Sequence, residues 1–378
     1  ITTFTMKNTI YKYFFHEFIR YFVVTLFAFA VIVWTIQSVN FLDLVIEDGH
    51  AFTTYFYYSL LTLSKVLTKL IPFCFMVALV LTISKLERDN EMIALWTSGL
   101  NKIYIVNLIF RISLLIMFIQ IILTSAINPT LLNFSRSVIK NSQLEFVPSL
   151  LRERQFNDTV EGLTIFVEKS RNQIYKNIFI RDEGKVLSKI GDESSTIFAK
   201  SGQMSDDEKN LILYNGNIQK LNREGDVSII KFEKTILNLA GLVTKSVTEP
   251  KIQETSTFKI LLCILKKNID MHNCQENKKS LMDIKIEFNK RFGMPIYIPL
   301  ISVICSFLLS SRRDQKIYGY NKYIYFFLGF VILAISEIIV RYSGISWTHS
   351  IIYYLIPLLL LPIFYFSLIK KFKYENLF

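Results

Sequence analysis

Five basic residues lie in or beside long apolar segments of this 378-residue chain, where charge is rare because placing it in lipid is costly. Lys65 and Lys69 are four residues apart, so a helix would place both on one face. With a helical rise of 1.5 Å per residue, these bases are expected at a similar depth, roughly 24–30 Å from the far end of the apolar segment. Charges at that depth usually face a polar cavity, where they could bind the phosphates of an anionic amphiphile. The predicted anion-binding residues are Lys65, Lys69, Lys290, Arg291 and Arg341.

A simpler interpretation of these bases stays open. Their long side chains could extend to the lipid headgroups without lining a cavity, and Arg341 could pair with Glu337 one helical turn earlier. Arg111, near the other end of its apolar segment, is expected to extend to headgroups in this way. Proline would loosen helices that line a pathway, although membrane helices often contain it. The prolines concerned are Pro72, Pro295, Pro299, Pro357 and Pro362.

A polar connector at residues 84–101, between two apolar segments, carries the second set of candidates. Asp89 or Asn90 could cap a helix here, and Gly99 is placed to end it. Acidic residues stand where the helix dipole is positive, and apolar residues follow at helical spacing, with Ile93 among them. Such a helix could press on another protein, or it could rest on lipid headgroups. The candidate contact residues are Glu87, Asp89, Glu91, Met92, Leu95 and Trp96.

No familiar catalytic pattern occurs in the sequence. A GxxxxGK[ST] phosphate loop, GxSxG and HExxH are all absent, so we expect no catalytic residue, metal or cofactor in this chain. An intramembrane enzyme would need clustered histidines or carboxylates within the spans, and Glu337 alone is too little. Cys263 and Cys274 could form a disulfide in an oxidising compartment, but two unpaired thiols are favoured. His272 beside Cys274 is too little for a metal site.

Composition indicates a membrane protein. Hydrophobic residues make up 51% of the chain, and phenylalanine alone numbers 32. The formal net charge of +12 suits loops near anionic lipid, and nucleic-acid binding is disfavoured because no basic run is interleaved with aromatic residues. Five residues precede Met6, which is the expected natural start. Six spans are expected, at residues 21–42, 53–84, 103–128, 292–311, 323–341 and 347–369.

Basic residues near the span ends predict the orientation. They gather in the connector, in a second short loop around Arg312 and Arg313, and in the tail after residue 369. The opposite loops, 43–51 and 342–346, contain no Lys or Arg. The positive-inside rule therefore places both termini in the cytoplasm and the polar region after the third span outside it.

That polar region is expected to be an exported all-β domain. Alternation at 163–168 and short apolar runs at 174–180, 196–199, 211–214 and 227–236 predict strands, with turns at Asn215-Gly216 and at 224–226. A sandwich or open jelly roll is favoured, followed by amphipathic helix from about 251 onward. The predicted organisation is a membrane α-helical protein with an inserted jellyroll-like domain. Its parts are 1–128 with the connector helix at 86–99, 129–290, and 291–378.

The chain resembles, over essentially its whole length, the LptF/LptG (YjgP/YjgQ) permeases of the lipopolysaccharide export ABC transporter. The connector is the most specific match, and the β domain alone would be a weak one. The matching residues are 70–72, 85–86, 89–94 and 98–100, the strand 211–214 with Asn215-Gly216, and 286–291 leading to Pro295.

The resemblance implies a non-catalytic permease subunit that extracts lipopolysaccharide from the bacterial inner membrane and passes it to a periplasmic bridge. The connector would be the coupling helix, docked on the ATPase LptB with Glu91 at the family's acidic position, and LptB would bind ATP and Mg²⁺. Lipid A phosphates would meet the five bases. LptG-like chains carry a lysine in the first span, and 21–42 has none, which favours LptF. The implied partners are an LptB dimer, the LptG paralogue (or LptF if this chain is LptG), LptC, LptA and lipopolysaccharide.

A different class of function stays open, in which the chain is a membrane-anchored periplasmic adaptor or signal transmitter. Such a protein needs no transport cavity. Neutralising Lys65, Lys69 and Arg341 together would then leave its function intact.

Overall fold

The computed structural model describes residues 2–46, 51–141, 151, 153–158, 160, 162–171, 174–183, 194–205, 210–221, 227–239, 251–265, 274, 278–310 and 318–375. The chain forms two compact units, which are described separately. The first comprises Ile1–Trp34, Leu63–Leu132 and Lys251–Phe378, and the second Thr35–Thr62 and Asn133–Pro250.

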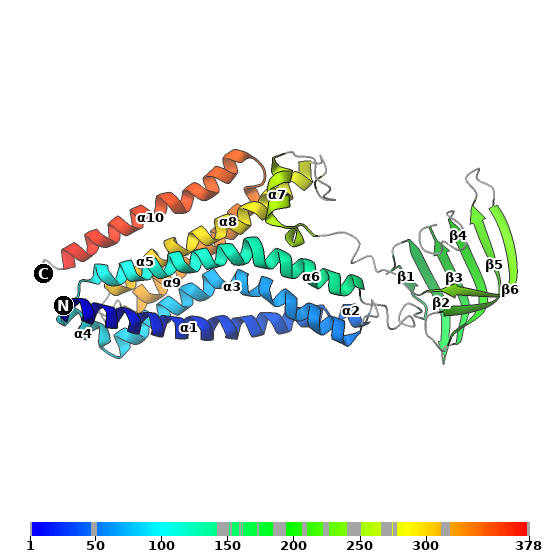
Figure 1. Ribbon diagram of the computed structural model, residues 1–378, viewed down its shortest axis with the longest axis horizontal. Helices are drawn as coiled ribbons and strands as arrows, with labels where there is room; N and C mark the ends of the chain where they lie inside the picture. Colours follow the sequence, from blue (N-terminus) through cyan, green and yellow to red (C-terminus); the bar gives the residue numbers. More distant parts are fainter. Residues whose placement is uncertain are drawn as a thin grey trace. The chain divides into compact units, whose positions relative to one another are not determined.

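Six helices of the described residues are long and apolar enough to cross a membrane, which confirms the predicted number of spans. Figure 1 shows them running beside one another. Most extend beyond the predicted apolar limits because helical hydrogen bonding continues through polar flanks. They are α1 (Thr2–Asn40), α3 (Phe52–Arg88), α5 (Lys102–Ile122) continued by the π-helix η1 (Leu123–Ile127) and α6 (Asn128–Asn141), α8 (Lys278–Ser306) with the 3₁₀ turn η6 (Phe307–Ser310), α9 (Tyr318–Tyr342) and α10 (Trp347–Glu375).

The core of the helical unit lies around α3 and α8. In the apolar 18-residue stretch of each helix, 67% of the residues are buried for α3 and 83% for α8. The corresponding values are 6% for α1 and 17% for both α9 and α10. Helix α10 can approach α8 closely because Gly293 has no side chain, since a Cβ there would lie 2.2 Å from the Tyr353 ring. Asn289 of α8 donates to Ser343 Oγ and Ser350 Oγ, both at 2.9 Å. Buried polar contacts therefore join α8 to the C-terminal end of α9 and the first turn of α10.

The connector forms a shorter helix than the predicted 86–99, namely α4 (Glu91–Thr97). Helix α3 continues to Arg88, and Asn90 then adopts a left-handed backbone with φ 59°, which interrupts the helix. Asn90 occupies the N-cap position, but its side chain makes no capping hydrogen bond, so the predicted side-chain cap is wrong. Gly99, with φ 80°, follows the helix end as predicted.

The inserted domain contains one six-stranded antiparallel sheet in sequence order, which confirms the predicted all-β insert. Among the described strands this is a meander, without the two facing sheets of a sandwich. One face carries the buried residues Ile165, Val167, Ile178 and Leu213. The strands are β1 (Phe156–Asn157), β2 (Leu163–Arg171), β3 (Ile174–Asp182), β4 (Ser195–Met204), β5 (Asn210–Leu221) and β6 (Val227–Asn238).

The predicted Asn215-Gly216 turn is wrong, because both residues lie inside β5. Asn215 has a left-handed backbone with φ 51°, and Asn177 of β3 has the same φ. Asparagine tolerates this conformation, so an Asn-Gly pair can bend a strand as well as reverse it. The other predicted turn, at 224–226, lies outside the described residues. Short helical segments follow the domain, namely η5 (Ile252–Glu254) and α7 (Thr257–Ile264).

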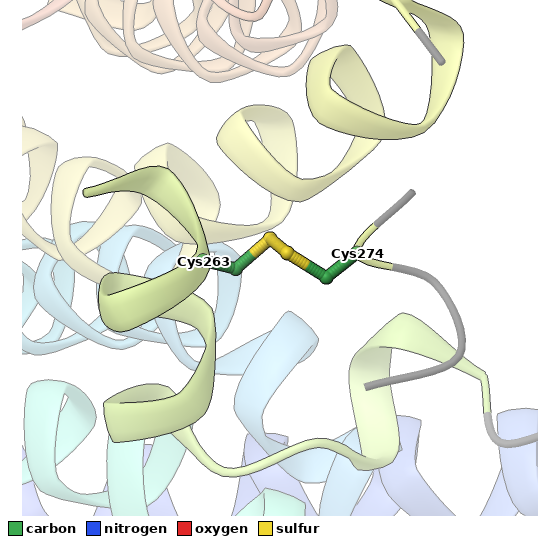
Figure 2. Close-up of a disulfide and its surroundings, with 2 residues drawn as sticks. All are labelled: Cys263 and Cys274. Carbon is green, nitrogen blue, oxygen red and sulfur yellow. A yellow bond between two sulfur atoms is a disulfide. The ribbon is translucent and has the colours of Figure 1, made fainter. Parts of the chain in front are cut away.

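Cys263 and Cys274 form a disulfide, so the prediction of two unpaired thiols is wrong (Figure 2). Helix α7 buries Ile260 and Cys263 against Ile284 of α8. This packing holds Cys263 where its Cα lies 6.0 Å from that of Cys274, within the range that a disulfide can bridge. Residue 272, the predicted histidine neighbour, lies outside the described residues.

Candidate functional site

A cavity of about 410 Å³ opens within the helical unit between α3, α5, α8 and α9. Lys65, Lys69, Lys290 and Arg291 line it, as the sequence predicted. Arg341 does not line it and is exposed to the surroundings of α9. The four remaining bases differ in whether a carboxylate of the protein already neutralises them.

Apolar side chains share the lining of the cavity with the bases. Phe73 of α3 and Phe330 of α9 meet at a ring-centroid distance of 6.3 Å, and Pro72, Met294 and Leu333 extend the same surface. The cavity therefore combines cationic groups with hydrocarbon, the combination that a lipid with an anionic headgroup requires.

Lys65 and Lys69 are the bases best placed to bind an anion. They lie one turn apart on α3, where Lys65 is partly buried and Lys69 is exposed. Within the described parts of the chain, neither ammonium group makes an ion pair or a hydrogen bond. A cation in this setting gains most from an anionic partner that a ligand supplies.

Lys290 is already paired inside the protein. Its Nζ lies 2.6 Å from Glu337 Oε1 of α9. Glu337 thus bonds to another helix and not to Arg341 one turn away, so the alternative Glu337–Arg341 pair is wrong. Its partner comes from a segment 47 residues away, which spacing within α9 could not show.

Arg291 is buried, with 3% of its side chain exposed, and its donors are occupied. Nε lies 3.1 Å from Glu287 Oε1, and one terminal nitrogen donates to Thr257 Oγ1 at 2.8 Å. The guanidinium also donates to three backbone carbonyls just before α7. These carbonyls belong to Ile252, Gln253 and Thr255. Arg291 therefore clamps the segment that leads into α7 against α8, and Gln253 of that segment lines the cavity.

Helix α5 braces two helices that contain proline. Pro72 has no N–H for the carbonyl of Thr68, and Gln120 Nε2 donates to that oxygen instead at 3.2 Å. Pro295 likewise frees the carbonyl of Arg291, to which Thr124 Oγ1 donates at 2.8 Å. Thr124 lies in the π-helix η1, a geometry that is frequent at functional sites.

Sequence reasoning missed these bracing residues, although amides in an apolar segment were a visible signal. Gln120 is 2% exposed, and its Oε1 has no hydrogen-bond partner among the described residues. Asn128 donates to Thr68 Oγ1 at 2.7 Å and accepts from Ser64 Oγ at 2.5 Å. Both amides therefore hold the part of α3 that carries Lys65 and Lys69, through the neighbouring residues Ser64 and Thr68.

The second candidate surface, on α4, has a different outward face from the one predicted. Met92 is buried at 4% exposure, and Leu95 and Trp96 pack against the same core. Ile93, which is absent from the predicted contact set, is 55% exposed. An apolar stripe at helical spacing looks the same whether it faces the core or a partner, which is why the direction was not predictable.

The acidic residues of the connector are partly engaged inside the protein. Glu87 is 9% exposed, and Asp89 lies 3.5 Å from Arg88 at the surface. Glu91 Oε1 accepts a hydrogen bond from Tyr13 of α1 at 2.9 Å. The residues of α4 that face outward are Ile93, Ala94 and Thr97.

Two comparisons with known proteins bear on this chain. The family model for "Lipopolysaccharide export system permease LptF/LptG" matches residues 12–371. An uncharacterized protein of Rickettsia prowazekii (strain Madrid E), RP871, is 26% identical over 252 residues. The aligned region covers 64% of this chain and 66% of that relative, just under two thirds of its length.

Proposed function

Because this chain belongs to the LptF/LptG family of lipopolysaccharide export permeases, we propose that it forms part of the route by which lipopolysaccharide leaves the membrane. The family is non-catalytic and supplies the permease subunits of the Lpt ABC transporter. The chain is a multi-pass membrane protein with six candidate spans among its described residues. In this proposal a separate ATPase drives transport, and the chain binds the lipid and moves with the ATPase.

The observation that carries the proposal is the cavity with two unneutralised lysines. Lys65 and Lys69 offer positive charge to lipid A phosphates, and the wall around Phe73 and Phe330 offers hydrocarbon to acyl chains. An adaptor or signal transmitter would need neither feature. The cavity therefore favours transport over that alternative.

Orientation and partners belong to the same proposal. The α4 end of the helical unit, with Lys85, Arg88 and Lys102, lies in the cytoplasm, as do both termini. The Cys263–Cys274 disulfide supports a periplasmic position for α7. An LptB dimer binds α4 and holds ATP and Mg²⁺, the sheet joins LptC and LptA, and an LptG paralogue completes the permease. The absence of lysine from residues 21–42 supports the LptF role for this chain.

Photo-crosslinking from Phe73 tests the proposal. We expect a crosslinking amino acid there to capture lipopolysaccharide, and Lys65→Gln with Lys69→Gln to reduce the capture at least about tenfold, since even one charge-assisted contact contributes roughly 1.5–3 kcal/mol. The matched control is Lys370→Gln with Lys373→Gln, which removes the same charge from exposed positions of α10. Capture of phospholipid alone, or equal capture by both double variants, would contradict a lipopolysaccharide site.

A further inference from the structure

Helix α1 has most of its buried side chains near its N-terminal end. Among its described side chains four are buried, and three of these, Phe14, Glu17 and Phe18, lie within five residues. Phe18 meets Phe75 of α3 at a ring-centroid distance of 5.5 Å. Farther along, Phe29 meets Phe73 of α3 at a ring-centroid distance of 5.4 Å, but only 6% of the most apolar stretch of α1 is buried, so the other side of the helix can face lipid or another helix.

Two polar contacts at this end join α1 to both sides of the break between α3 and α4. Glu17 Oε2 lies 2.9 Å from Lys85 Nζ, in the last turn of α3, with 9% and 20% of the two side chains exposed. Tyr13 Oη donates at 2.9 Å to Glu91, the first residue of α4. Figure 1 shows the N-terminal end of α1 beside α4.

The arrangement has a mechanical consequence. Tyr13 and Glu17 are one turn apart on a continuous helix, whereas Lys85 and Glu91 lie on opposite sides of the left-handed residue Asn90. Helix α4 cannot turn about Asn90 without moving Glu91 relative to Lys85. Such a turn must either break one of the two contacts or carry α1 along with α4.

We propose that Tyr13 and Glu17 are positioning residues that lock the N-terminal part of α1 to the α3–α4 junction, Glu17 through Lys85 of α3 and Tyr13 through Glu91 of α4, so that a push on α4 displaces α1. The inference rests on the proposed function, in which an ATPase presses on α4. It gives Glu91 a role within the chain, as the acceptor for Tyr13, in addition to any contact with the ATPase. Because one side of α1 is exposed, its displacement would change the surface that the protein presents along that helix.

The test is a charge exchange in the assembled transporter, with lipopolysaccharide release per ATP hydrolysed as the measurement. We expect Glu17→Lys and Lys85→Glu each to lower that ratio about tenfold, since breaking a buried ion pair has large effects, and the double exchange to restore most of it. Tyr13→Phe, which removes one hydroxyl and keeps the ring, should lower the ratio about fivefold. Lys12→Glu, an exposed position on the same helix, is the control and should leave it unchanged.

Co-purification of the ATPase distinguishes failure of the proposed function from failure of the proposed lock. If the unaltered chain binds no ATPase, the proposed function fails. If the ATPase binds every variant and the ratio stays at the parental value in Tyr13→Phe and in the single charge changes, the lock is refuted while the proposed function stands. Failure of the double exchange to restore the ratio in a folded, ATPase-bound complex also refutes it.

Discussion

Replacing Arg291 with methionine tests whether this guanidinium stabilises the fold or binds a ligand. Its side chain is 3% exposed and forms an ion pair with Glu287, whose side chain is 16% exposed. It also donates to the carbonyls that precede α7. Methionine has a similar length but offers no donor, so Glu287 would keep its charge without a partner.

The expected cost follows from that burial. Removing one partner of a buried ion pair typically costs about 3–5 kcal/mol, because the remaining charge is uncompensated. We therefore expect Arg291→Met to lower the free energy of unfolding by roughly 4 kcal/mol, a large part of the ~5–15 kcal/mol typical of proteins. Combining it with Glu287→Leu removes both charges and should recover much of the loss.

The assay is the melting temperature of the purified chain in detergent, with proteolysis of the Ile252–Glu254 segment as a local measure of release. Lys65→Met is the control, because Lys65 has no ion pair among the described residues, and its unfolding free energy should change by no more than ~0.5 kcal/mol. If Arg291→Met melts like the parent and loses lipopolysaccharide capture as Lys65→Met does, Arg291 binds the ligand and the clamp is refuted.

Three further predictions concern other parts of the helical unit. Replacing Cys263 and Cys274 with serine opens a loop with a sequence separation of 11. Because the unfolded chain then gains conformational entropy, the α7 region should be destabilised by about 3 kcal/mol. Proteolysis there should begin earlier, and unchanged protection from the protease would contradict this. Ile93→Asp should abolish co-purification of the ATPase without changing the melting temperature, and retained binding would exclude this face of α4. Gln120→Leu should cost about 1–3 kcal/mol in unfolding free energy, because the carbonyl of Thr68 loses its donor, whereas an unchanged melting temperature would mean that another group satisfies it.

The spans and the all-β insert could be predicted because they depend on local sequence. A bilayer requires about 20 apolar residues in each spanning helix, and the strand alternation of residues 163–168 needs no knowledge of partners. The depth of a residue along a helix could also be counted from the sequence, and four of the five bases predicted in this way line one cavity. Arg341 failed this test because depth says nothing about which side of a helix faces inward.

Other features depended on segments distant in sequence. Arg291 and Lys290 are adjacent, yet one is bound by the segment before α7 and the other by Glu337 of α9. The stripe on α4 faces the core through Met92, which only the packing of neighbouring helices decides. Pairing of Cys263 with Cys274 likewise required the contact of α7 with α8.

Helix α3 connects the two candidate surfaces, and this connection limits how the protein can move. Its N-terminal half carries Lys65 and Lys69, its C-terminal end carries Lys85, and Pro72 lies between them. Bending is easiest at a proline, where the backbone hydrogen bond to Thr68 is missing and a single donor from Gln120 replaces it. A displacement that begins at α4 and passes along α3 must therefore cross a point held by α5. Since Thr124 of η1 donates to the equivalent carbonyl of α8, the continuous α5–η1 segment is hydrogen-bonded to both proline-containing walls of the cavity, and we expect it to oppose their separation.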